Sequence, residues 1–483
     1  MDRSGIFPLR CFELGLIGIL AVCGGCGGSS RHGQAGAGTS GAAPAQTQAI
    51  APLSADDVSL LFPVPTRAGD LANLIAVSDL TTPNGQDPTK RDPVWPDAVF
   101  QQFIAIAASP AAQVAGTPTR IGLPTEALSK SNWFIAGIRV DAGAPGLSRE
   151  VQGQFGRSPE IRLIIQPVTR NLDGTPKVDD IAGHLIFDFT TIGAPAQAGC
   201  LPLRVPDLDA LNAIVADVAA IRTKLADGQL GTDKVSTSGV PLGIHPGLAD
   251  PTTANNLRSE IVAFLERHIS GQRLDAMAIA GLPANAGNPW IFLSMGQVGP
   301  GVVPALPNGG FVPVPSPTLD GQEFAEMLEP AGKLPRVVPA PQTNNLNAIT
   351  CKNNAAPAGL PVAGRSGVAT AALFGNTPPT ANTTAQVVDV IADPTKSHFF
   401  NTDCVSCHTE TRRRMDILGV KAIPGIDPAA LPNGQWDVRN FGWGDAGRAG
   451  MQATVTQRTA AETAAVVTFI NSEMLAKRTV LNH

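Results

Sequence analysis

The sequence predicts a multidomain protein in which a mixed α and β module precedes a smaller C-terminal domain. The chain has 483 residues, enough for about three domains of ordinary size. Runs of β-branched and aromatic residues between about 133 and 191 predict strands, and residues 206–270 show the periodicity of amphipathic helices. A stretch rich in Pro, Gly and Asn at 335–383 then marks a linker before the C-terminal domain, residues 384–483.

Composition and charge restrict the class of function. Apolar residues make up 43% of the chain, so a buried core is expected, and 50 Gly with 42 Pro predict long loops between ordered elements. Acidic residues slightly outnumber basic ones, giving a net charge of −5 without a long basic run. Binding to nucleic acid requires clustered Lys and Arg to neutralise phosphates, so this class of partner is excluded.

Residues 1–28 have the features of an export signal. Arg3 and Arg10 precede an uninterrupted apolar run, Leu14–Val22. A helix that spans a membrane needs about 20 such residues, so this run is too short to remain as one. We therefore expect an exported protein.

The residues after the apolar run resemble the lipobox of bacterial lipoproteins. Cys26 follows Gly25, and Cys23 has Leu20 three positions before it. The resemblance implies that Cys26, or Cys23 in the other register, carries a lipid that tethers the protein to a membrane. Residues 29–49 are rich in Gly and Ala and predict a flexible tether. The expected location is periplasmic or associated with the outer membrane.

The module at 50–334 carries most of the expected secondary structure. A short helix is predicted near 97–107, and two longer helices have regular apolar stripes. The strands are separated by Gly, Pro and Asp clusters. The expected strands are 133–140, 161–168, 184–190 and 289–295, and the expected longer helices are 206–225 and 255–269.

Residues that could perform chemistry are scarce in this module. His184, His245 and His268 are isolated in sequence, and the motifs of serine hydrolases, P-loop proteins and dinucleotide-binding proteins are missing. Cys200 and Cys351 could form a disulfide in an oxidising compartment, or remain two separate thiols. The role of the module therefore stays open at this stage.

The strongest chemical signal is the run Cys404-Val405-Ser406-Cys407-His408. C-x-x-C-H is the attachment sequence of c-type haem. Two thiols add to the vinyl groups of one porphyrin, and the adjoining imidazole then reaches the iron. On a helix, Cys at i and i+3 with His at i+4 lie on one side. A redox pair of cysteines or half of a zinc site are the alternatives.

Residues from about 384 to 483 resemble a single-haem cytochrome c domain of the small class I type. Phe400 lies where that family commonly has an aromatic residue, Lys396 replaces its usual glycine, and Thr459–Glu462 fits a capping box for a last helix. The resemblance implies an all-α domain with one haem c. Cys404 and Cys407 would bind it covalently, and His408 would be the proximal iron ligand.

The distal ligand of the iron can be approached by elimination. Met415 would lie on the same side of the ring as His408, Met474 reads as core of the last helix, and His398 is sterically awkward. Met451 stands in a Gly-flanked loop before that helix, an order that resembles the distal Met loop of class I domains. Met451 is the candidate, with an open site as the alternative.

Two further features bear on a haem site. Arg412, Arg413 and Arg414 predict a solvated helix face, or alternatively one Arg that pairs with a haem propionate. Trp436 and Trp443 are expected to help bury the ring.

The sequence therefore predicts a membrane-tethered electron carrier rather than an enzyme, with an unidentified redox partner protein. One alternative is an extracytoplasmic oxidoreductase whose 50–334 module is catalytic or binding while the haem relays electrons. Another is a surface binding lipoprotein with a structural or sensory haem.

Overall fold

Residues 49–483 form a unit built around one large antiparallel sheet. The computed structural model describes residues 51–87, 89–109, 112–114, 117–143, 159–194, 203–284, 290–298, 309–314, 338–339, 381–394, 404–434 and 437–476. Several residues singled out above lie outside this set: Cys23, Cys26, Cys200, Cys351, Lys396, His398, Phe400 and Trp436.

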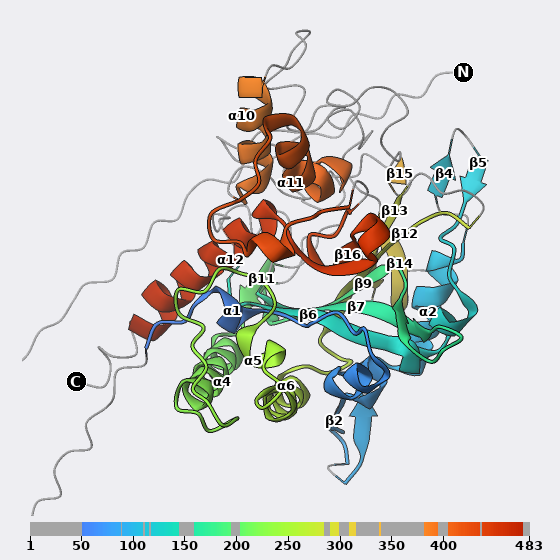
Figure 1. Cartoon of the computed structure of the whole chain (residues 1–483). Coiled ribbons are helices and arrows are strands. Elements are labelled where there is room, and N and C mark those ends of the chain that lie inside the picture. Colours follow the sequence, from blue (N-terminus) through green and yellow to red (C-terminus); the bar gives the residue numbers. More distant parts are fainter. Residues whose placement is uncertain are drawn as a thin grey trace, which may run out of the picture. The chain divides into compact units, whose positions relative to one another are not determined.

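A large antiparallel sheet organises this unit (Figure 1). Its strands are ordered β1 (Ser59–Leu61), β6 (Trp133–Asp141), β7 (Glu160–Arg170), β9 (Ala182–Asp188), β12 (Leu274–Gly281), β13 (Ile291–Val298) and β14 (Gly310–Val314). At the margins, β8 (Pro176–Val178) pairs with β7, and β15 (Val338–Pro339) runs parallel to β13. The strands predicted within 133–191 and near 289–295 are confirmed as β6, β7, β9 and β13.

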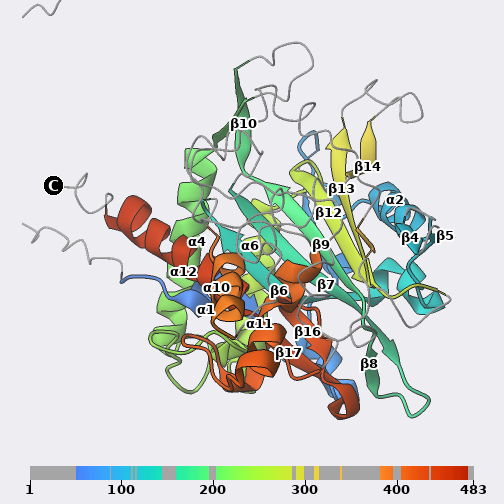
Figure 2. The ribbon, with the colours of Figure 1, turned by 90° about the horizontal axis from the view of Figure 1, so that it is seen from above.

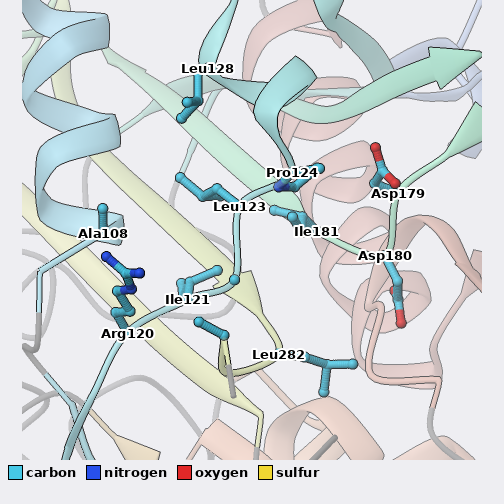
Figure 3. A pocket seen from close by; sticks show the side chains of 12 residues that line it. Ala108, Arg120, Ile121, Leu123, Pro124, Leu128, Asp179, Asp180, Ile181 and Leu282 are labelled. Atoms are coloured by element: carbon cyan, nitrogen blue, oxygen red, sulfur yellow. The ribbon is translucent and has the colours of Figure 1, made fainter. Parts of the chain in front are cut away.

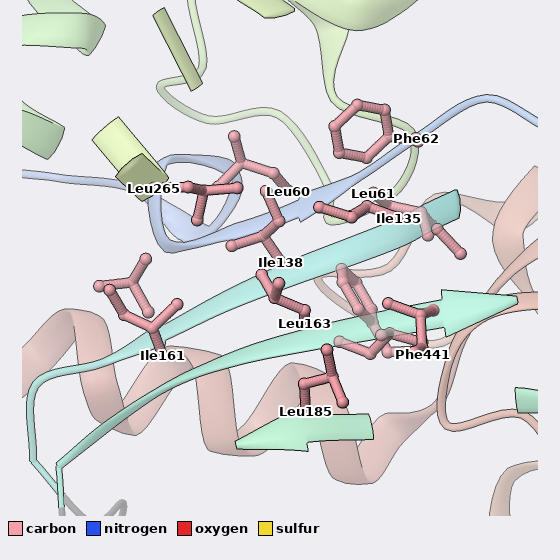
Figure 4. Close-up of a cluster of buried hydrophobic side chains, with 14 of the residues drawn as sticks. Leu60, Leu61, Phe62, Ile135, Ile138, Ile161, Leu163, Leu185, Leu265 and Phe441 are labelled. Carbon is pink, nitrogen blue, oxygen red and sulfur yellow. The ribbon is translucent and has the colours of Figure 1, made fainter. Parts of the chain in front are cut away.

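One face of the sheet is apolar because alternate residues of each strand point to it. The register aligns one residue from each of five neighbouring strands in a single buried row: Ile138, Leu163, Leu185, Met277 and Met295. Figure 4 shows several of these side chains gathered with Leu60 of β1 and Leu265. This row forms the centre of the hydrophobic core.

Helices α4 (Leu208–Ala226) and α6 (Ala254–His268) cover this apolar face, which we call the helix face. Both helices, and α2 (Asp97–Ala107), are confirmed close to their predicted bounds. Leu208, the first residue of α4, is 65% exposed, whereas Leu211 and Val215 are buried, so the apolar stripe of this helix begins at Leu211.

The fold predicted for residues 384–483 is wrong. They form α10 (Ala381–Ala392), α11 (Cys404–Leu418), the hairpin β16 (Phe441–Asp445) and β17 (Met451–Val455), and α12 (Gln457–Phe469), which continues as the π-turn η7 (Ile470–Leu475). An all-α class I cytochrome c domain is not seen among the described residues. Strand β17 stands where a Gly-flanked loop around Met451 was expected, and the segment packs on the sheet instead of on itself.

The hairpin and α12 cover the second face of the sheet, which we call the hairpin face. Figure 1 shows α4, α5 (Pro246–Ala249) and α6 on one side of β6 and β7, with α10, α11 and β16 on the other. Figure 2 shows the C-terminal elements above the same strands. The contact is close, because a Cβ atom at Gly137 of β6 would lie 2.7 Å from the ring of Phe441.

Short elements complete the unit. They include α1 (Ala55–Val58) and three two-stranded sheets, made by β2 (Thr81–Pro83) with β3 (Arg91–Pro93), β4 (Ala112–Val114) with β5 (Thr117–Thr119), and β10 (Thr190–Ala194) with β11 (Leu203–Pro206). In the described part of the chain, we find no helix with the length and apolarity that crossing a membrane requires.

Candidate functional site

The C-x-x-C-H residues open helix α11. Cys404 is the first residue of this helix, Cys407 is the fourth and His408 is the fifth. At this spacing the three residues lie on one side of the helix, as the motif predicts. The structure thus brings the predicted attachment residues together at the N-terminal end of one helix.

His408 is held by a backbone carbonyl and by an aromatic ring. Its Nδ1–H donates to the carbonyl oxygen of Val438 at 2.8 Å. Its ring centroid lies 4.4 Å from that of Phe292 on β13, with the planes tilted by 50°. Burial lowers the pKa of His408 to about 4, so the imidazole is neutral at physiological pH. Its Nε2 makes no hydrogen bond to the described residues.

Cys407 lies beside Asn440. The amide nitrogen of Asn440 is 3.9 Å from the Cys407 sulfur, while the buried amide oxygen has no hydrogen-bond partner within the described ranges. Burial raises the pKa of the Cys407 thiol to about 11, so the thiol is protonated at neutral pH. Among the described residues, we find no group of three or more His, Cys, Asp or Glu side chains that could hold a metal ion.

Residues 437–440 form the segment that faces the motif. Asp437 accepts hydrogen bonds from the Arg439 amide at 2.9 Å and the Thr454 hydroxyl at 2.7 Å. The carbonyl of Asn440 accepts from the Thr456 amide at 3.0 Å. Burial raises the pKa of Asp437 to about 7. These bonds fix the segment to the hairpin and so fix the Val438 carbonyl that orients His408.

A buried charged cluster connects α11 to α12 and to the sheet. Glu410 accepts a hydrogen bond from the Arg458 amide at 3.0 Å, and the Arg458 side chain pairs with Glu462 at 2.7 Å. Glu462 also pairs with Arg139 of β6 at 2.7 Å. Burial raises the pKa of Glu410 to about 7. The motif helix is therefore attached to the sheet by polar contacts.

The start of α12 corrects one prediction. The N-cap is Thr456, whose hydroxyl accepts from the Thr459 amide at 3.3 Å. Thr459 instead donates its hydroxyl to Asn440, and Glu462 is occupied by the two arginines. The pattern Thr459–Glu462 is therefore not a capping box here, because both side chains serve tertiary contacts.

The three arginines after the motif do not form a solvated face. Arg413 is 1% exposed, Arg412 pairs with Asp416 at 2.6 Å, and Arg414 pairs with Asp389 of α10. They connect α11 to its own next turn and to α10, so the expectation of a solvated helix face is wrong.

Trp443 and Met474 both belong to the hydrophobic core. Trp443 is fully buried and donates its indole N–H to the Phe62 carbonyl at 2.8 Å, so this N–H is engaged within the core. Met474 is 9% exposed in η7, which confirms it as a core residue.

Met451 stands at the opposite end of the hairpin from the residues that meet 437–440. It is the first residue of β17 and pairs with Asp445, whereas Val455 and Thr456 at the other end lie next to that segment. The assignment of Met451 as the distal ligand stays a prediction.

The sheet beneath His408 is lined by small residues. The register places Ala182 and Ala280 in one row with Phe292, and His184, Ala278 and Ser294 in the next row on the same face. Ala182, Ala280, Ala278 and Ser294 are small, so Phe292 and His184 are the bulky side chains of these two rows.

A separate pocket of about 610 Å³ lies at the ends of the central strands β9 and β12 (Figure 3). Arg120 stands on one side of it, and Asp179 and Asp180 stand on the other. Asp180 is already paired with Arg439 at 2.7 Å, and apolar residues form most of the remaining wall. Among the described residues that line this pocket we find no nucleophile paired with a base.

Sequence reasoning found the motif but missed its surroundings. Val438 acts through its backbone carbonyl, for which no residue type gives a signal, and Phe292 comes from a strand more than 100 residues earlier. We found no family model, curated protein or solved structure that matches the chain.

Proposed function

We propose that the chain is a c-type cytochrome that carries one haem on Cys404, Cys407 and His408 and transfers single electrons. The observation that carries this proposal is the state of His408. Its Nδ1–H is bonded to a backbone carbonyl, and its Nε2 is neutral and without a hydrogen bond to the described residues. This is the arrangement of a histidine prepared to bind a metal through Nε2.

The residues at the C-x-x-C-H motif fit a covalently bound haem. Two cysteines and a histidine at the attachment spacing begin one helix, and the buried amide oxygen of Asn440 next to Cys407 lacks a partner among the described residues. A bound haem would supply an iron that alternates between ferric and ferrous states. The chain contributes the orientation of His408 through Val438 and anchors the motif helix through Glu410 and Arg458.

The zinc and redox alternatives have less support. A zinc site needs further Cys or His ligands, and the described residues near the motif offer none in a cluster. A redox pair of cysteines requires a reactive thiolate, yet burial raises the pKa of Cys407 to about 11. A protonated thiol is no obstacle to haem attachment by a maturation system.

Covalent attachment can be tested directly. The protein would be produced in a periplasm that contains the cytochrome c maturation machinery, and denatured samples would be stained for haem. Wild type is expected to retain the stain, and the double variant Cys404→Ser, Cys407→Ser to lose it. Ser406→Ala, inside the same motif, is the matched control and should stain like wild type. Haem retained by the double variant after denaturation would contradict the proposal.

We also propose that a lipid on Cys26 tethers the protein to a membrane, on the evidence of the N-terminal sequence. Growth with a radioactive fatty acid should label wild type and the Cys23→Ser variant but not Cys26→Ser. Loss of label in the Cys23 variant alone would move the anchor to Cys23, and an unlabelled wild type would contradict a lipid anchor.

A further inference from the structure

A second histidine lies on the same face of the sheet as the motif. His184 of β9 pairs in register with Ile164 on one side and Ala278 on the other. Ile164 belongs to the hairpin face, because its side chain approaches Gly442 of the hairpin. His184 therefore points toward the layer that contains α11, and away from α4 and α6.

The position of His184 relative to His408 follows from the register. His408 lies over Phe292, and Phe292 pairs with Ala280, two residues beyond Ala278 on β12. His184 is thus two strands and two residues away from Phe292, a Cα separation of about 12 Å. His408 packs over Phe292, so the imidazoles of His184 and His408 lie over neighbouring parts of the same face of the sheet.

The surroundings of His184 leave its imidazole available. The ring is half-buried and forms no hydrogen bond to the described residues. Its cross-strand neighbour Ala278 is small, so nothing from that strand covers it. Burial first, and then the positive charges of Arg162 and Arg439, lower the pKa of His184 well below its usual value. The imidazole is therefore neutral and able to donate a lone pair at physiological pH.

We propose that His184 binds the haem iron on the side opposite His408, so that the iron has two imidazole ligands. This inference rests on the proposed function above. His184 stands in the centre of the sheet, where β9 is hydrogen-bonded to β7 on one side and to β12 on the other, so the backbone position of this ligand is fixed. Paired imidazoles favour a lower reduction potential than a Met and His pair.

The test compares the spectra of haem-loaded variants of the full chain. Oxidised wild type is expected to be low-spin without the thioether–iron band, and its reduced form to bind carbon monoxide slowly. His184→Ala should keep covalent haem, become high-spin, and bind carbon monoxide at least tenfold faster. Added imidazole should restore the low-spin spectrum of this variant. His184→Met should gain the thioether–iron band.

The matched control is His268→Gln, because His268 lies in α6 on the helix face and is paired with Asp217 at 2.7 Å. Its spectrum should equal that of wild type. A thioether–iron band in wild type that disappears in Met451→Ala would overturn the inference and assign Met451. An unchanged spectrum in His184→Ala would also overturn it. Both outcomes leave the haem itself in place, whereas a wild type without covalent haem would refute the proposed function as well.

Discussion

At the scale of single residues, burial decides which ionisable groups are charged. His408 and His184 are both kept neutral by desolvation, which makes them donors rather than cations. Arg139 of β6 and Arg458 of α12 both pair with Glu462 where the two layers meet. A buried charge is tolerated only when it is paired, so neutral imidazoles and paired arginines can share one interior.

Asp56 provides a prediction on pH dependence. It is fully buried at the start of α1, and desolvation, with smaller contributions from Asp57 and Asp427, raises its pKa from 3.8 to about 8. Between about pH 4 and pH 8, Asp56 is therefore protonated in the folded protein and ionised in the unfolded chain. The contribution of Asp56 to stability is fully present below pH 4 and is lost as the pH rises through 8.

Asp56→Asn should remove this contribution to the pH dependence. We expect the difference in free energy of unfolding between pH 5 and pH 8, measured in urea, to be smaller in the variant than in wild type. Asp209→Asn, at an exposed position of α4, is the control and should keep the wild-type difference. An equal pH dependence in wild type and Asp56→Asn would show that Asp56 is already ionised in the folded protein.

At the scale of elements, the hairpin β16–β17 shows how tertiary contacts override local sequence. Gly442 and Gly444 disfavour a strand, and Gly442 has a φ of 133°. Yet the hairpin forms, because Gly442 permits close approach to Ile164, and Trp443 finds a hydrogen-bonding partner in the sheet. Gly442 is needed for close packing on the sheet, and Gly444 for close packing against Asp437.

Gln166 should be essential for docking the hairpin. Its side chain accepts from the Trp443 amide at 2.7 Å and donates to the Trp443 carbonyl at 2.9 Å. Gln166→Ala leaves both buried backbone groups unpaired, so we expect a loss of about 2 kcal/mol or more in the free energy of unfolding. Gln297→Ala, exposed on β13, should change it by less than about 0.5 kcal/mol. Equal urea midpoints for the two variants would contradict this role.

At the scale of the whole molecule, the motif-bearing segment and the sheet form one structure. Phe441 packs on Gly137, Trp443 bonds to Gln166 and Phe62, and Glu462 pairs with Arg139. Each contact joins residues separated by more than 270 positions in sequence. The proposed haem site is therefore built jointly by an early sheet and a late helix.

The fragment 381–483 should not fold by itself. Alone, it would expose Phe441 and Trp443 and leave Glu462 without Arg139, so we expect no cooperative thermal transition by circular dichroism. Co-expression with a fragment 49–380 should restore a cooperative transition if the two parts associate. A sharp transition of the isolated fragment would instead indicate an autonomous domain.

The sequence by itself determined the features that depend on neighbours along the chain. Periodicity located strands β6, β7 and β9 and helices α2, α4 and α6, because each buries a regular stripe of its own residues. The spacing of Cys404, Cys407 and His408 placed them on one side of a helix for the same reason.

Only the tertiary structure decided how the last part of the chain folds and what surrounds His408. The hairpin at 441–455 reads as loop because its glycines carry no strand signal, and its stability comes from Gln166 and Gly137 far away in sequence. The Val438 carbonyl, the Phe292 ring and the position of His184 likewise depend on sheet register. Contacts between residues so distant in sequence leave no local periodicity, so they emerge only when the layers pack together.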